Sequence, residues 1–341
     1  MVGVALGDRA PEVVGATASG GFYSLEIQAG RPAVLLFLHG CGPVAARGLL
    51  DALRPALATL DETGVDLVPL APQDLAYAQA IDGGGGACRK TVYAASPWPL
   101  EQVDGPAALV LDRSGRVVHS ALVYGAEDLL QVHALAAAHL WSEEPRRCAS
   151  SAPVLILPNL MTPANCHALI HHFEAAQHRA GVMAAVRDGQ AVVKLDESKK
   201  RRREIELQAG APEHELILRV LAERCAPEIK RAFQADMAHA DRILLARYDE
   251  SGGYFKRHRD DAAPQTAFRE FAISINLNTQ DYEGGELLFP EFDDHRYSPP
   301  AGSAIIFSAS LLHEAAPVTR GSRYVALSFL CSAGAMARMP S

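Results

Sequence analysis

The sequence of 341 residues lacks the features that would place the chain in or across a membrane. It has no run of about eighteen apolar residues, the length that a helix needs to span the hydrocarbon core. Its beginning, MVGVALGDRAPE, has no basic stretch followed by an apolar run, the pattern that marks a signal peptide. We therefore expect a cytoplasmic protein without a membrane partner.

Closely spaced cysteines and a positive net charge are also missing. The six cysteines show no tight spacing, and in a chain of this size we expect reduced thiols. The formal net charge of −8 argues against nucleic acid as a partner. The exception is the basic run KKRRR (199–203), which acidic residues flank. We expect a solvated face there; the alternative is a segment at the mouth of an active site, where an arginine attracts an acidic substrate.

What the sequence does contain is enough apolar material for two domains. Hydrophobic residues make up 49% of the chain and charged residues 21%, as in a globular protein with a substantial core. The length favours about two domains. Because SEEPRRCASSA (142–152) is polar and contains proline and serine, we expect domains over 1–144 and 153–341, joined by a linker over 145–152.

In the first half, segments that suit strands alternate with segments that suit helices, which predicts an α/β sheet. The strands are expected at 33–39 and 65–70 and in a hairpin over 107–119, and the helices at about 44–62, 72–81 and 127–141.

Three motifs of this half, GDRAP (7–11), LFLHGCGP (36–43) and GPAALVLDRSGRVV (105–118), resemble the thioredoxin/peroxiredoxin fold. Pro106 takes the place of that family's cis-proline. The family's two-cysteine loop needs a second cysteine where this chain has Val44, and its peroxidatic pattern needs a threonine in place of Leu38. We therefore expect a degenerate scaffold for docking or assembly, with Cys41 and Cys88 as a redox pair in the alternative interpretation.

The second half has short apolar runs separated by turns and no long helix after about residue 240. Strands are expected over 242–248, 253–260, 271–278, 303–308 and 323–330. This pattern predicts an antiparallel β-sandwich or barrel.

Four residues of this region fit one chemistry: His258, Asp260, His313 and Arg323. His258 and Asp260 are two positions apart on an expected strand, so their side chains would point to the same side. Two imidazoles and one carboxylate on one face of a metal leave three positions open, which suits a non-haem Fe(II) that activates oxygen. Arg323 would add a fixed cation for a dicarboxylate co-substrate.

Other histidines offer weaker metal sites. The segment Asp293-Asp294-His295 suits a solvated charged loop, because such loops are usually hydrated. His167 and His171 lie one turn apart on an expected helix, but no further ligands have the spacing of a zinc site. We expect a polar helix face there.

Longer motifs around the four residues resemble 2-oxoglutarate/iron(II) dioxygenases of the prolyl 4-hydroxylase type. They are ILPNLMTPANCHALI (156–170), RYDESGGYFKRHRD (247–260), EGGELLFPEF (283–292), PPAGSAIIFSASLLHEAAPVTRG (299–321) and RYVALSF (323–329). The resemblance covers about half of the chain. It implies an α+β domain whose core is a double-stranded β-helix, also called a jelly-roll or cupin-like fold.

The resemblance also implies the roles of individual residues. His258, Asp260 and His313 correspond to the iron ligands, and Arg323 corresponds to the partner of the distal carboxylate of 2-oxoglutarate.

Tyr248 resembles the family's tyrosine near the co-substrate. Where several relatives place another tyrosine that contacts the co-substrate, this chain has Ser274 and Asn276. These two residues are therefore the candidates for the second contact with the co-substrate carboxylate.

The implied activity is a dioxygenase that uses Fe(II) and 2-oxoglutarate, with ascorbate as a candidate reductant. It would hydroxylate an unactivated C–H bond of a prolyl or other residue in a peptide or protein, and release succinate and CO2. Alternatives are a hydroxylase of a free amino acid or small metabolite, a thiol-dependent redox enzyme that uses Cys41 with an accessory C-terminal domain, and a non-catalytic binding protein. The sequence leaves the substrate and the formation of a homo-oligomer open.

Overall fold

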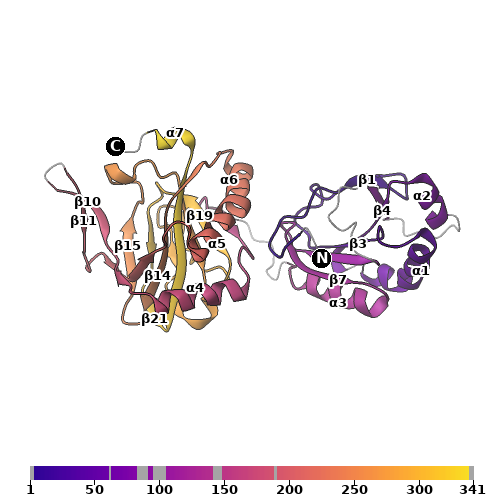
Figure 1. Ribbon diagram of the computed structural model, residues 1–341, viewed down its shortest axis with the longest axis horizontal. Helices are drawn as coiled ribbons and strands as arrows, with labels where there is room; N and C mark the ends of the chain where they lie inside the picture. Colours follow the sequence, from indigo (N-terminus) through magenta and orange to yellow (C-terminus); the bar gives the residue numbers. More distant parts are fainter. Residues whose placement is uncertain are drawn as a thin grey trace. The chain divides into compact units, whose positions relative to one another are not determined.

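Figure 1 shows the computed structural model, which describes residues 4–60, 63–82, 91–94, 105–140, 148–187 and 190–337. The chain divides into two compact units, Met1–Pro145 and Arg146–Ser341. Among the described residues, no helix combines the length and the apolar character needed to cross a membrane.

The N-terminal unit contains one seven-stranded sheet and three helices within the described part of the chain. Its elements are β1 (Val14–Thr17), β2 (Phe22–Ser24), β3 (Ala33–Phe37), α1 (Pro43–Leu60), β4 (Asp66–Pro72), α2 (Leu75–Asp82), β5 (Val92–Ala94), β6 (Ala107–Leu111), β7 (Val117–Leu122) and α3 (Ala126–Ala137). The strand order is β2-β1-β5-β4-β3-β6-β7. Strands β3, β4 and β5 are parallel, whereas β6 pairs antiparallel with β3.

The central strand β3 is buried along its whole length because both faces of the sheet are covered. Val34 and Leu36 pack in one apolar cluster with residues of α1 and α3. Leu35 and Phe37 belong to a second cluster. The α/β sheet expected for this half is therefore confirmed. The expected cis-proline is not, because no peptide bond in the described part of the chain is cis, and the bond before Pro106 is trans.

The C-terminal unit combines antiparallel sheets with helices. Its elements are β8 (Leu155–Leu157), α4 (Pro163–Ala175), β9 (Arg179–Ala180), β10 (Met183–Arg187), β11 (Gln190–Lys194), β12 (Lys200–Arg201), β13 (Arg203–Glu206), α5 (Pro212–Val220), the π-helical turn η2 (Leu221–Cys225), α6 (Ala226–Phe233), β14 (His239–Asp249), β15 (Tyr254–His258), β16 (Phe271–Asn276), β17 (Glu283–Gly284), β18 (Leu287–Leu288), β19 (Ala304–Ser308), β20 (His313–Ala315), β21 (Val318–Arg320), β22 (Ser322–Cys331) and α7 (Ala333–Met336).

Two of these sheets define the unit. The large sheet has the order β8-β19-β16-β22-β14-β13-β9, and the small sheet has the order β12-β15-β20-β18. One apolar cluster joins them and includes Val325 of the large sheet and Ala315 of the small sheet. On the other face of the large sheet, helices α4, α5 and α6 pack through a separate cluster that includes Phe173 and Ile273 (Figure 1). The unit is therefore built in layers of helices, large sheet and small sheet.

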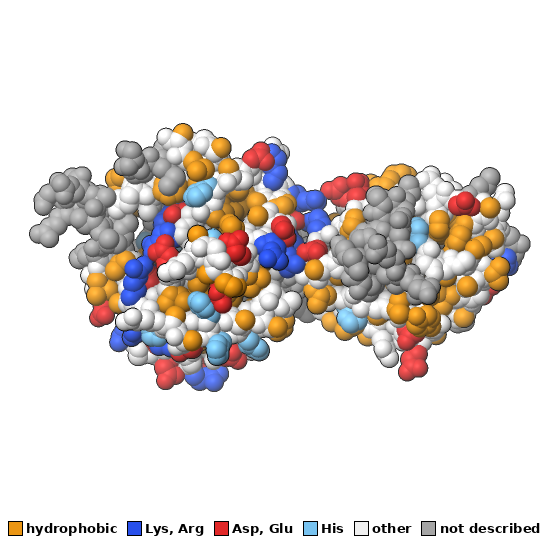
Figure 2. Space-filling model, in the orientation of Figure 1, with side chains coloured by type: hydrophobic (Ala, Val, Ile, Leu, Met, Phe, Trp, Pro, Cys, Tyr) orange, Lys and Arg blue, Asp and Glu red, His pale blue; other side chains and the backbone are white. Residues whose placement is uncertain are grey.

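The outer surface mixes charges of both signs. Figure 2 shows basic and acidic side chains close together over the C-terminal unit, with apolar side chains scattered among them. Exposed ion pairs such as Arg320 with Glu283 contribute little stability, because water and salt screen them. The apolar clusters between the layers therefore dominate the stability of the fold.

A glycine in the PPAG turn fixes the start of β19. Gly302 has a φ of +79°, and its N–H donates to the carbonyl oxygen of Asn276 at 2.8 Å. Its own carbonyl oxygen accepts hydrogen bonds from the N–H groups of Leu160 and Met161. A Cβ atom at this position would collide with the Met161 carbonyl oxygen. The turn thus joins the segment before α4 to the strand that carries Asn276.

We expect Gly302→Ala to lower the free energy of unfolding by about 3 kcal/mol, because it combines a left-handed backbone with a backbone collision. Gly210→Ala is the matched control, since Gly210 also has a positive φ, of +83°, but open space around its Cα. It should cost only about 1 kcal/mol. Urea unfolding of both variants measures the difference, and equal losses would contradict the proposed collision.

Candidate active site

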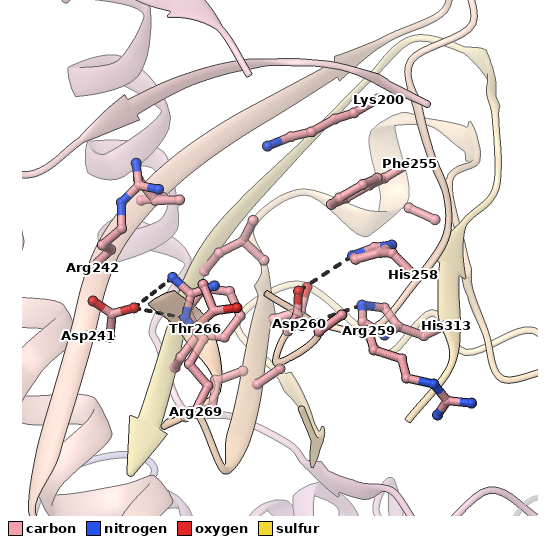
Figure 3. A pocket seen from close by; sticks show the side chains of 18 of the residues that line it. Lys200, Asp241, Arg242, Phe255, His258, Arg259, Asp260, Thr266, Arg269 and His313 are labelled. Atoms are coloured by element: carbon pink, nitrogen blue, oxygen red, sulfur yellow. Dashed lines mark hydrogen bonds and ion pairs between the residues drawn. The ribbon is translucent and has the colours of Figure 1, made fainter. Parts of the chain in front are cut away.

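The ends of two neighbouring strands bring His258, Asp260 and His313 together. His258 ends β15 and lies opposite His313, the first residue of β20. Asp260 follows β15, and its N–H donates to the carbonyl oxygen of Ala309 at 2.9 Å. The carboxylate lies 3.4 Å from Nε2 of His258 and 3.5 Å from Nε2 of His313, between the two rings (Figure 3).

The expectation that His258 and Asp260 share one face of a strand is therefore wrong. The strand ends at His258, so the turn after β15, rather than strand alternation, directs the carboxylate of Asp260. The potential ligand atoms of this triad with His313 all lie within 4.8 Å of one another, and no other such group occurs among the described residues.

Backbone carbonyls orient both imidazoles. Nδ1 of His258 lies 2.7 Å from the carbonyl oxygen of Lys256, and Nδ1 of His313 lies 2.9 Å from that of Leu311. A neutral imidazole in this position carries its proton on Nδ1 and leaves the lone pair of Nε2 for a metal. Both Nε2 atoms face Asp260, so the two lone pairs converge on one point.

The pKa values of two members of the triad, His313 and Asp260, are shifted in the folded protein. His313 is 4% exposed, and burial lowers its pKa to about 4, although Asp260 acts in the opposite direction. Burial would raise the pKa of Asp260, but the two neighbouring histidines outweigh it and hold the pKa below its usual range. At neutral pH His313 is therefore neutral and Asp260 ionised, which are the forms that bind a metal ion.

Arg323 is a buried cation without an acidic partner. It is 2% exposed at the second position of β22, and Tyr248 of β14 lies opposite it. Its Nη2 donates to Oδ1 of Asn276 at 3.1 Å and to Oγ of Ser274 at 3.4 Å. Its Nε has no acceptor, and no carboxylate of the described residues forms an ion pair with it. Because an unpaired buried charge is costly, this corner of the site favours an anion.

Tyr248 and the two candidates for a second co-substrate contact, Ser274 and Asn276, surround Arg323 in different ways. Asn276 uses its amide to hold the arginine, since its Nδ2 donates to the carbonyl oxygen of Pro299 at 3.0 Å. The hydroxyl of Ser274 contacts the arginine weakly. The centre of the Tyr248 ring lies 5.3 Å from the guanidinium carbon of Arg323. The guanidinium is therefore held by Asn276 and Ser274 through hydrogen bonds and by Tyr248 through ring contact.

A second group of charged residues lies near the triad and belongs to the KKRRR run, for which an active-site segment is the alternative interpretation. The expectation of a solvated KKRRR run is wrong for its second and fourth members: Lys200 is 4% exposed and the side chain of Arg202 is 7% exposed. The other three members are exposed. Alternate residues of an extended segment face opposite sides, so Lys200, Arg202 and Glu204 all point inward. Residues 199–203 are all basic, so no pattern in the sequence separates the buried members from their exposed neighbours.

A cavity of about 860 Å³ connects these features. The triad, Arg323 and Ser274 line it together with Lys200 and Arg202. In Figure 3, Phe255 lies between Lys200 and His258, and the amine of Lys200 points into the open space.

The remaining sequence candidates lie elsewhere. His167 and His171 are exposed on α4, and the carboxylate of Asp293 accepts hydrogen bonds from the Tyr297 hydroxyl and the Ala152 N–H. The carboxylate of Asp293 is therefore engaged in hydrogen bonds within the protein.

Cys41 precedes α1 in the N-terminal unit, and its thiol donates to the carbonyl oxygen of Leu38 at 3.1 Å. Burial raises the pKa of the thiol, and the hydrogen bond with Tyr77 only partly opposes this. Cys88, its expected redox partner, lies outside the described residues. A raised pKa disfavours the thiolate form that redox chemistry needs.

We expect Cys41 to react more slowly with iodoacetamide than the exposed Cys148 at neutral pH, because the thiolate is the reactive form. Its rate should rise steeply only above about pH 9, as the raised pKa requires. Mass spectrometry of the two cysteine-containing peptides across pH measures both rates at once. A Cys41 rate that is already maximal at pH 7 would instead support the redox interpretation.

Comparison with known proteins agrees with this site. A family model described as the 2OG-Fe(II) oxygenase superfamily matches residues 243–331. A PKHD-type hydroxylase from Methylobacterium nodulans is 32% identical over 181 residues, which are 50% of this chain and 74% of the relative. One from a Synechococcus species is 38% identical over 96 residues, which are 26% of this chain and 42% of the relative. The chain spans about half the length of the first curated relatives that it matches.

Solved structures of lower sequence identity also match parts of the chain. A viral collagen prolyl hydroxylase from Paramecium Bursaria Chlorella virus-1, in complex with 2OG, has 19% identity and a TM-score of 0.40, and the match covers 53% of this chain and 96% of that chain. A putative thiol:disulfide interchange protein DsbE from Chlorobium tepidum has 21% identity and a TM-score of 0.33, with coverages of 40% and 99%. The family model and the Methylobacterium nodulans relative together show that the chain belongs to the 2OG-Fe(II) oxygenase superfamily, whose members use Fe(II) and 2-oxoglutarate.

Proposed function

We propose that the chain is an Fe(II)- and 2-oxoglutarate-dependent dioxygenase that hydroxylates a prolyl or other residue of a peptide or protein. The observation that carries this proposal is the buried, unpaired guanidinium of Arg323, which lines the same cavity as the triad. A metal site alone would need no such cation. A site that binds a metal and a dicarboxylate together needs both the triad and the buried cation.

The donor sets fit the two groups. His258, Asp260 and His313 offer two imidazole nitrogens and one carboxylate to the same side of a metal ion, which suits Fe(II) with open positions. Arg323 offers donors that have only neutral acceptors or none among the described residues, which suits a carboxylate of 2-oxoglutarate. When bound, Fe(II) would activate O2 together with 2-oxoglutarate, which would be converted to succinate and CO2. One oxygen atom of O2 would enter succinate and the other the hydroxyl group formed from the C–H bond.

The chain's own residues position these groups and limit the access of water. Tyr248 is buried beside Arg323, and its hydroxyl accepts a hydrogen bond from Nη1 of Arg202 at 2.8 Å. Because that acceptor role is filled by Arg202, the hydroxyl proton of Tyr248 is directed elsewhere, and we assign it as the second donor to the co-substrate. Phe255 stacks on His258, and Phe307 packs against His313, so apolar rings shield both imidazoles.

The finer architecture belongs to the same proposal. The two antiparallel sheets of the C-terminal unit support a double-stranded β-helix domain over 153–341. A central strand flanked by a parallel and an antiparallel neighbour supports a thioredoxin-like domain over 1–144, with a linker over 145–152.

We expect Asp260→Ala to reduce 2-oxoglutarate turnover at least about a hundredfold, because loss of the only carboxylate ligand removes both charge and a metal bond. Asp261→Ala is the matched control. It removes the same charge from the next residue, whose side chain does not line the cavity. The assay measures succinate released without added substrate. Anaerobic addition of Fe(II) and 2-oxoglutarate should also give a weak visible absorption band only where the triad is intact. Turnover of Asp260→Ala at the wild-type rate would contradict the ligand assignment.

A further inference from the structure

We propose that Lys200 and Arg202, here named the basic pair, bind a carboxylate of the substrate inside the cavity. The inference rests on the proposed function, since it describes how the same site would hold the molecule that is hydroxylated. The carboxylate is either an acidic side chain of a peptide or the terminal carboxylate of a peptide or amino acid.

The basic pair lies one aromatic ring away from a metal ligand. The Nζ atom of Lys200 is 5.2 Å from the centre of the Phe255 ring, and the guanidinium carbon of Arg202 is 5.8 Å from it. The Phe255 ring stacks on the imidazole of His258 (Figure 3). A substrate group held by the basic pair would therefore place neighbouring atoms close to the metal site.

The charges of the basic pair are not balanced within the protein. Both side chains contact the same carboxylate oxygen: Oε2 of Glu204 lies 3.2 Å from Nζ of Lys200 and 2.9 Å from Nη2 of Arg202. The other oxygen, Oε1, is buried and has no hydrogen-bond partner. Glu204 itself is 1% exposed. Two cations against one carboxylate leave one buried positive charge, which is costly until an anion binds.

The other charged groups of the cavity cannot supply that anion. Within the described part of the chain three of them have charged partners: Asp241 with Arg269, Arg242 with Glu206 and Arg259 with Glu291. Asp260 lies between the two histidines of the triad, where it would hold the metal ion. Two positive charges then remain, one at Arg323 and one at the basic pair. A carboxylate of the co-substrate would neutralise Arg323, and a carboxylate of the substrate would neutralise the charge of the basic pair.

The acid–base behaviour of Lys200 agrees with an anion site. Burial, together with the charges of Arg202 and Arg242, lowers the pKa of Lys200 to about 7, and Glu204 only partly opposes this shift. The empty site can therefore lose part of its charge near neutral pH. A bound carboxylate would favour the charged ammonium and raise this pKa again.

A purely structural role makes a different prediction. Nζ of Lys200 also donates to the carbonyl oxygen of Val182 at 2.7 Å, so the residue links two segments of the unit. If this link were its only role, replacing Lys200 would reduce stability but would not change the preference between an acid and its amide. That preference is therefore the property to measure.

The test uses the full chain loaded anaerobically with Fe(II) and 2-oxoglutarate, and calorimetric titration with three matched pairs of N-acetylated prolyl peptides. The pairs differ only in a C-terminal carboxylate against its amide, in Glu against Gln before the proline, or in Glu against Gln after it. We expect at least one acid to bind about tenfold more tightly than its amide or glutamine counterpart, which corresponds to about 1.4 kcal/mol. The pair that shows the preference identifies the source of the carboxylate.

Three variants assign the preference to the basic pair. Lys200→Met should abolish it, and Lys200→Arg should retain it, because the charge is kept. Lys199→Met is the matched control, since Lys199 belongs to the same basic run but is exposed and does not line the cavity. It should leave the preference unchanged.

Two results would overturn the inference: equal binding of acid and amide in all three pairs, or a preference that survives in Lys200→Met. The visible band of the loaded protein is recorded first. If the band is absent, the proposed function fails. If the band forms but no acid is preferred, only the carboxylate site fails.

Discussion

The C-terminal unit is organised around a buried guanidinium that the protein itself does not neutralise. Arg323 lies near the start of β22, the central strand of the large sheet, where Asn276 and Ser274 are its hydrogen-bond acceptors and Tyr248 lies beside it. The chain makes room for it with a glycine, since a Cβ atom at Gly285 would lie 2.9 Å from Cδ of Arg323. Burying an unpaired charge costs several kcal/mol, which the apolar clusters on both faces of the sheet must offset. Such a cost is typical of groups kept for a ligand rather than for stability.

The site depends on how the two sheets pack. Strands β15 and β20 of the small sheet carry the two histidines, whereas β22 of the large sheet carries Arg323. The apolar cluster between the sheets therefore fixes the separation of the triad from the cation. A change that shifts one sheet against the other would disturb the proposed metal and co-substrate sites together, even without touching a ligand.

Some of this arrangement could be predicted from the sequence, and some could not. The buried run of β3 and the strands around Arg323 follow from apolar patterns, and longer motifs pointed to the triad. The burial of Lys200 could not be predicted, because a charged extended segment has two faces and only the neighbouring sheet decides which one is covered. The placement of Asp260 in a turn was missed for a related reason: the strand ends where a long-range hydrogen bond to Ala309 replaces strand pairing.

We propose that Arg323 is held in place for a dicarboxylate, and the stability of Arg323→Met is the measurement that tests this role. Urea unfolding is measured with and without 2-oxoglutarate, with Mn(II) as a redox-inert metal. Without 2-oxoglutarate, we expect a variant at least as stable as wild type, because methionine removes the unpaired charge. At about a hundred times its dissociation constant, 2-oxoglutarate should stabilise wild type by about 2.7 kcal/mol and leave the variant unchanged. A variant that loses several kcal/mol of stability yet is still stabilised by 2-oxoglutarate would contradict the account.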